Sequence, residues 1–239
     1  MPDSGRPFFP TSLPYDGGHV PLKVRAHPRA RRIALKIDHA GDAVEMVLPR
    51  RCSYREALRF LEASRGWIDA RLATLPPRIP FVDGALIPVM DVPHPIRAVG
   101  PVRGKGPAWI EDGVIHVTGD PAFLTRRVRD FLRALAKREL SERAEAMAAQ
   151  IGRKVARVTV RDTVSRWGSC ARGGNLSFSW RLIFAPEAVI DYVVAHEVAH
   201  LIEMNHSQRF WRIVEQLHPD AKAERLWLNN NRLRLMRIG

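Results

Sequence analysis

The chain has 239 residues, enough for one large domain or two small ones with a buried core. Hydrophobic residues make up 46% and charged residues 26%, a balance that excludes a disordered chain and indicates a globular protein. The formal net charge of +13 favours anionic partners such as nucleic acid. The basic residues are scattered rather than grouped, so an arginine-rich, well-solvated surface explains the charge equally well.

The cysteines and the N-terminal sequence indicate the compartment. Cys52 and Cys170 lie far apart and form no CxxC pair, so we expect a reducing environment and no disulfide framework. Residues 1–19 are rich in Pro and Gly, lack the pattern of a signal peptide and predict a flexible tail. No apolar run is long enough to span a bilayer. We expect a cytoplasmic protein without a membrane partner, whereas no pattern indicates the oligomeric state.

Residues 20–118 predict a β-rich subdomain with one helix. Apolar residues alternate with polar ones over residues 24–37 and 44–48, which predicts strands, and His39–Asp42 predict a turn between them. Ser53 and Glu56 form a capping box that begins a helix, which ends before Pro76. Two Asp-Gly pairs further along, at residues 83–84 and 112–113, predict turns between short strands.

Residues 119–239 predict a mainly helical catalytic subdomain that begins at a break near Gly119. A long helix begins at Asp120 and Pro121 and ends at Gly152, and a strand and a hairpin that turns at Gly173 and Gly174 follow it. The remaining predicted elements are helices that begin at Pro186, at Ser207 and at Asp220. The whole chain therefore predicts an α+β protein, with a β-rich N-terminal half and helices in the C-terminal half.

The helix that begins at Pro186 contains the pattern H-E-x-x-H, formed by His196, Glu197 and His200. Two residues four apart lie about 40° apart on a helical wheel and one turn apart along the axis, so both imidazoles can bind one ion. Glu197 points between this edge and the apolar side of the helix. In such a site the metal lowers the pKa of a bound water and the glutamate takes its proton.

A metal site of this kind needs a third protein ligand, and we favour His206. In a continuous helix His206 would lie about 9 Å beyond His200 along the axis, too far to share an ion. Asn205 tolerates the left-handed conformation that ends helices, which would let the chain fold back. Glu203, which occupies the glycine position of the H-E-x-x-H-x-x-G-x-x-H pattern, is a rival ligand or an outer group. More distant rivals are Glu215, His218 and Glu224.

The run SRWGSC, followed by GNLSFSWRLIFAPEAVIDYVVAHEVAHLIEMNHSQRFW, resembles the YgjP-like metallopeptidases, and more loosely the SprT-like and Wss1-like proteases. The resemblance extends from about Val20 onward. It implies a zincin-like α+β fold, one Zn²⁺ ion held by His196, His200 and His206, Glu197 as the catalytic general base, and a peptide or protein substrate.

Other residues of these motifs allow two interpretations each. Arg166 either stabilises an oxyanion or, as we favour, forms a salt bridge. The Tyr192 hydroxyl either faces the site or packs in the core, and Cys170 is interpreted as a small packed residue. The strand Asn175–Trp180 is expected to leave one edge open, to which an extended peptide substrate would add.

The net positive charge leaves a second class of function open, namely nucleic-acid binding. The protein would then be a nucleic-acid-associated protease, or a basic nucleic-acid-binding protein with a mainly structural zinc. Glu197 and a set of only three ligands favour the enzyme, because structural zinc is usually four-coordinate and often bound by cysteine.

Overall fold

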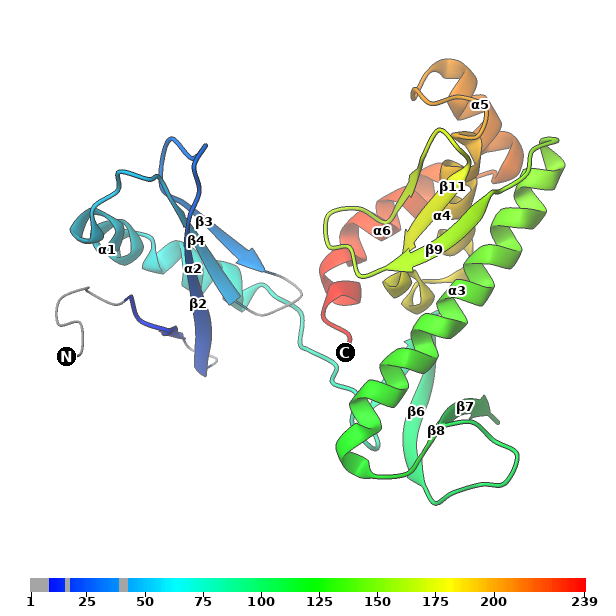
Figure 1. Cartoon of the computed structure of the whole chain (residues 1–239), viewed down its shortest axis with the longest axis horizontal. Coiled ribbons are helices and arrows are strands. Elements are labelled where there is room, and N and C mark those ends of the chain that lie inside the picture. Colours follow the sequence, from blue (N-terminus) through cyan, green and yellow to red (C-terminus); the bar gives the residue numbers. More distant parts are fainter. Residues whose placement is uncertain (1–8, 16–17, 39–42) are drawn as a thin grey trace. The chain divides into compact units, whose positions relative to one another are not determined.

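The computed structural model describes residues 9–15, 18–38 and 43–239, and the chain divides into two compact units, residues 1–76 and 77–239 (Figure 1). The division therefore lies at Pro76 and Pro77, whereas the sequence predicts a break near Gly119. The physical reason is that residues 86–118 share a hydrophobic core with the long helix that follows them.

Unit 1 contains a four-stranded sheet of order β1-β2-β4-β3. Its strands are β1 (Ser12–Tyr15), β2 (Gly18–Ala26), β3 (Ala34–Asp38) and β4 (Ala43–Leu48). Strands β2 and β4 are parallel, and the other pairs are antiparallel. The predicted flexible tail over residues 1–19 is thus wrong for β1 and the start of β2, since Leu13 is 4% exposed and packs in the core. The predicted turn at His39–Asp42 lies outside the described residues.

Two short helices pack with this sheet, α1 (Tyr54–Ala63) and α2 (Arg65–Ala73). The Ser53 hydroxyl accepts a hydrogen bond from the Glu56 amide at 3.2 Å, which confirms the predicted N-cap. The single helix expected here is broken at Ser64. Apolar residues of both helices and the sheet form the core of unit 1, among them Leu13, Val20, Val44, Met46, Leu61 and Ile68.

Unit 2 begins with a four-stranded sheet of order β5-β6-β8-β7. The strands are β5 (Leu86–Val89), β6 (Val92–Val99), β7 (Ala108–Glu111) and β8 (Val114–Thr118). Asp112 and Gly113 have φ of 50° and 72° and form the two-residue turn between β7 and β8, as the Asp-Gly pair predicts.

The long helix α3 (Leu124–Gln150) connects this sheet to the rest of unit 2 (Figure 1). The single turn η1 (Pro121–Phe123) precedes it, and the Asp120 carboxylate caps that turn by accepting from the Ala122 amide at 2.9 Å. Gly152, with φ of 64°, ends the helix as predicted. Strands β7 and β8 contact α3, and so do β9 and α4 further along the chain.

The second sheet of unit 2 has the order β10-β11-β9, in which β9 is Arg157–Arg161, β10 is Gly168–Cys170 and β11 is Asn175–Ser179. β11 pairs with β10 in antiparallel fashion and with β9 in parallel fashion. The prediction of an open edge on Asn175–Trp180 is therefore wrong, because both sides of β11 are paired. The edge strand that contacts α4 is β10.

The turn η2 (Trp180–Phe184) leads into α4 (Glu187–Ala199), which is followed by α5 (Gln208–Leu217) and α6 (Ala221–Met236). Nine residues of α4 are buried, because α3, α5, α6 and β10 all contact it. The Ser207 hydroxyl caps α5 by accepting from the Phe210 amide at 3.3 Å. The α+β class is confirmed, and no described helix combines the length and apolarity needed to cross a membrane.

Candidate metal centre

The helix that carries the H-E-x-x-H pattern does not continue to His206. α4 stops at Ala199, and His200 caps it with ordinary helical φ and ψ. The amides of Ile202 and Glu203 both donate to the Ala199 carbonyl at 3.1 Å, which closes the last turn. Asn205 does not adopt the left-handed conformation, so the expected reversal at that residue is wrong. The reversal is spread over the turn that begins directly after His200.

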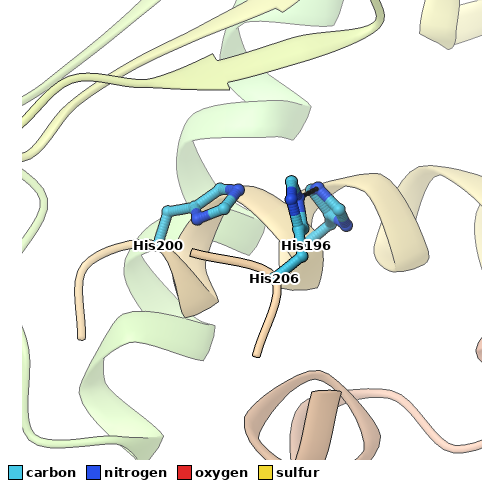
Figure 2. A group of neighbouring side chains, drawn as sticks. All are labelled: His196, His200 and His206. Atoms are coloured by element: carbon cyan, nitrogen blue, oxygen red, sulfur yellow. Dashed lines mark hydrogen bonds between the residues drawn. The ribbon is translucent and has the colours of Figure 1, made fainter. Parts of the chain in front are cut away.

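This early stop brings three histidines together (Figure 2). One ring nitrogen from each of His196, His200 and His206 lies within 4.8 Å of the others, and the Nε2 atoms of His196 and His206 are 3.1 Å apart. Two nitrogens bound to one tetrahedral zinc at 2.0–2.1 Å would be roughly 3.3 Å apart. The pair formed by His196 and His206 already has this spacing, and His200 lies close enough for its ring to move onto the same ion.

A backbone contact sets the ring of His200. Its Nδ1 lies 2.9 Å from the Glu203 carbonyl oxygen. A carbonyl can only accept, so Nδ1 carries the hydrogen and Nε2 keeps a lone pair for a metal. Glu203, a rival ligand in the sequence, thus contacts the site through its main chain, while its carboxylate accepts from the Asn205 amide at 3.3 Å. An outer contact of this kind is the usual means of orienting a ligating histidine.

Phe210 on α5 supports all three imidazoles. It is fully buried, and its ring centroid lies 4.9 Å from His196, 4.5 Å from His200 and 4.7 Å from His206. Trp211 adds a stacked contact to His206 at 6.0 Å. No role was predicted for either aromatic residue, although Phe210 and Trp211 follow the Ser207 cap within about one turn of helix.

Glu197 follows His196 in α4 and is only 6% exposed. It is packed against the backbone of β10 at Gly168. A Cβ atom at Gly168 would lie 2.5 Å from the Glu197 Oε1 and 2.8 Å from its Cδ, closer than atoms can approach. The SRWGSC run therefore has a steric link to the H-E-x-x-H helix, since only glycine leaves room for this carboxylate.

Burial controls the protonation of the site. It raises the pKa of Glu197 to about 7, and the charge of Arg166 opposes this rise. Burial, together with the charges of His200 and His206, lowers the pKa of His196 to about 4. Burial also lowers the pKa of His200. These lowered pKa values favour the neutral form of His196 and His200, the form that binds metal.

Three further residues of the motifs, Arg166, Tyr192 and Cys170, lie near Glu197 or His196. Arg166 forms no salt bridge with any described residue, and its charge acts on Glu197. Tyr192 is 6% exposed and its ring meets that of His196 edge-on at 6.2 Å. Burial raises the pKa of Cys170 to about 11, so its thiol stays protonated, as expected of a packed residue rather than a nucleophile.

A cavity of about 220 Å³ opens onto these groups. Gly168, Tyr192, His196 and Glu197 line it, together with Arg225 of α6. A larger cavity of about 780 Å³ between α5 and the start of α6 also includes Arg225 but none of the three histidines. The smaller cavity is the candidate reaction site, because the buried carboxylate and a histidine face it.

Comparison with known proteins agrees with the motifs. The sequence model of a family described as YgjP-like, metallopeptidase domain, matches residues 31–231, which is more than half of the chain. No match was found among curated proteins. The chain is similar to the crystal structure of the metallopeptidase zymogen of Pyrococcus abyssi abylysin, with 22% identity and a TM-score of 0.35, over 38% of this chain and 93% of that one. A likeness this distant does not establish the fold.

The geometry predicts which third residue binds the metal. Replacing His206 by Ala should weaken zinc binding by more than about 100-fold, because the loss of a ligand exceeds the loss of an outer contact. The matched control is Glu203→Gln, which keeps the main-chain contact to His200 and should bind zinc like the wild type. Competition with a chromophoric chelator measures both. The reverse order of affinities would show that Glu203 is the ligand.

The raised pKa of Glu197 predicts a pH-dependent stability of the metal-free protein. A carboxyl pKa raised from 4.5 to about 7 contributes roughly 3 kcal/mol to the free energy of unfolding at pH values below 4.5. This contribution is lost as the pH rises through 7. Glu197→Gln does not titrate. Between about pH 5 and about pH 8, urea unfolding should therefore show wild type losing stability relative to Glu197→Gln. A constant difference between the two proteins would contradict the buried carboxyl.

Proposed function

Because the chain belongs to the YgjP-like metallopeptidase family, we propose that it is a zinc-dependent peptidase with a zincin-like catalytic unit. In this proposal His196, His200 and His206 hold one Zn²⁺ ion, and Glu197 acts as the general base. The observation that carries this proposal is the convergence of three imidazoles beside a buried carboxylate. Three ligands favour a catalytic over a structural site, because they leave a position of the ion open.

Zinc supplies Lewis acidity in such a site and lowers the pKa of water toward 7. The protein supplies the proton acceptor. A nearby cation favours the ionised carboxylate, which offsets the rise in pKa that burial causes, so Glu197 is ionised near neutral pH when the metal is bound. It can then take a proton from water and transfer it to the departing amine of the cleaved peptide.

The fold offers a peptide a place to bind beside these groups. β10 is an edge strand of its sheet, contacts α4, and begins at Gly168, which packs against Glu197. An extended peptide that adds to this edge is held by main-chain hydrogen bonds. Its backbone would pass over the cavity that Glu197 and His196 line. We therefore propose β10, and not β11, as the strand to which an extended peptide would add.

The proposal predicts a separation of metal binding from catalysis at Glu197. Glu197→Gln should keep zinc at one ion per chain and lower the hydrolysis of casein or a peptide library by about 10²–10⁴-fold, the usual contribution of a general base. Metal analysis and a digest with and without chelator measure the two quantities. Full activity of this variant would contradict the assignment of Glu197, and equal activity after removal of the metal would contradict a metallopeptidase.

Gly168 tests the same site from the opposite element. Gly168→Ala places a methyl group where the Glu197 carboxylate lies, so the carboxylate must shift. A displacement of about 1 Å at a reacting group lowers rates by about 100-fold, and we expect a loss of that order in kcat with zinc retained. Gly106→Ala is the matched control, because a Cβ atom at Gly106 would have no neighbouring atom within 4 Å. Equal activities of the two variants would contradict the steric link.

A further inference from the structure

A third cavity, of about 350 Å³, is lined in part by His200 and is not used by the proposed reaction. It is formed by the segment after α3, the turn between β10 and β11, and the loop after α4. Three cations line it, Arg153, Lys154 and Arg172. We refer to it as the basic cavity.

The backbone around the basic cavity is held in place by hydrogen bonds. The Arg153 amide donates to the Ala148 carbonyl at 2.9 Å, directly after the helix stop at Gly152. The Gly174 amide donates to Ala171 at 2.9 Å, and the Gly174 carbonyl accepts from Ala156 at 3.0 Å. The segments that carry the cations are thus fixed relative to each other, so the positive charges are concentrated at one place.

The charge of the basic cavity is not neutralised within the described part of the chain. None of the three cations forms an ion pair there, and no acidic residue lines the cavity. Glu203 follows the lining residue Ile202 in the sequence, but its carboxylate accepts from the Asn205 amide. Three like charges around one cavity repel each other, and an anion between them removes that repulsion.

The remaining lining residues are apolar. Leu201 and Ile202 are half-buried, and Met204 is 43% exposed. A glutamate or aspartate side chain matches this combination, since its methylene groups can contact the apolar wall while its carboxylate meets the cations.

The basic cavity also lies where a bound peptide would reach it. Its lining includes Ala171–Gly174, the residues that follow β10, and His200 of the candidate metal centre. A peptide that pairs with β10 in the antiparallel sense, the more stable arrangement, passes this turn before it reaches Gly168 and Glu197. Arg172 is four residues from Gly168, so the peptide side chain at the cavity precedes the scissile bond by roughly two to four residues.

We propose that the basic cavity is a specificity site that binds an acidic side chain of the peptide substrate on the N-terminal side of the scissile bond. This inference rests on the proposed peptidase function and names its substrate class. A peptide fits better than nucleic acid, because the cations surround one cavity beside His200, whereas a phosphate backbone is bound by charges that follow a groove.

The test uses the zinc-loaded full chain and fluorogenic peptides in which Glu or Gln occupies each of the four positions before the cleaved bond. Wild type should cleave one Glu peptide about tenfold better, by kcat/KM, than its Gln counterpart. In the triple variant Arg153→Gln, Lys154→Met, Arg172→Gln, that ratio should fall to about one. The effect should appear mainly in KM, and Arg172→Lys should keep most of the preference.

The matched control removes the same charge elsewhere, through Arg55→Gln, Arg59→Gln and Lys137→Met, at exposed residues outside the basic cavity. It should keep the wild-type ratio, and thermal unfolding should show that both triple variants are folded.

If wild type cleaves Glu and Gln peptides equally, the peptidase function stands and the specificity site is refuted. If it cleaves neither, and the Glu197→Gln protein binds no acidic peptide by fluorescence anisotropy, both fall. Loss of single-stranded DNA binding in the triple variant without any change in the Glu/Gln ratio would assign the basic cavity to nucleic acid instead.

Discussion

The close approach of three imidazoles is the constraint on which the candidate site depends. Rings whose nitrogens lie within 4.8 Å of one another cannot all carry a positive charge without strong repulsion. Burial and this mutual repulsion lower the pKa of His196 to about 4, so it is neutral at ordinary pH. Keeping His196 uncharged and buried costs stability in the metal-free protein, and a divalent ion bound by the three histidines would offset that cost. Aromatic packing on Phe210 makes the arrangement specific, because the ring contacts all three histidines at once.

The site also joins two parts of the sequence that are almost thirty residues apart. Gly168 begins β10 and Glu197 lies near the end of α4, yet the carboxylate occupies the space that any side chain at residue 168 would fill. The contact explains why glycine follows tryptophan in the SRWGSC run. It also sets the electrostatics, since close packing by β10 excludes solvent from the carboxylate and raises its pKa. β10, the strand to which we propose that a peptide adds, is therefore also the strand that positions the proposed base.

Local patterns predicted the helices of unit 2 well, and the three histidines proposed as ligands lie close together. Caps at Asp120 and Ser207 and the stop at Gly152 depend on a few neighbouring residues, so the sequence was sufficient for them. The predictions that were wrong depended on distant partners. Whether β11 is an edge strand depends on its pairing with β9, and the place of the division between units depends on which core residues 86–118 join. The role of Phe210 has the same origin, since it becomes visible only once α5 folds back on the end of α4.

The net charge of +13 takes on a different meaning once residues are placed in space. In the sequence the basic residues look scattered, and they favour nucleic acid no more than a solvated surface. In the fold, the end of α3 and the β10–β11 turn bring Arg153, Lys154 and Arg172 around one cavity that His200 also lines. Salt screens exposed charges over about 8 Å, so only cations grouped this closely act together on a ligand. A charge that is spread along the chain can therefore select an anionic group at one place, beside the atoms proposed to cleave the substrate.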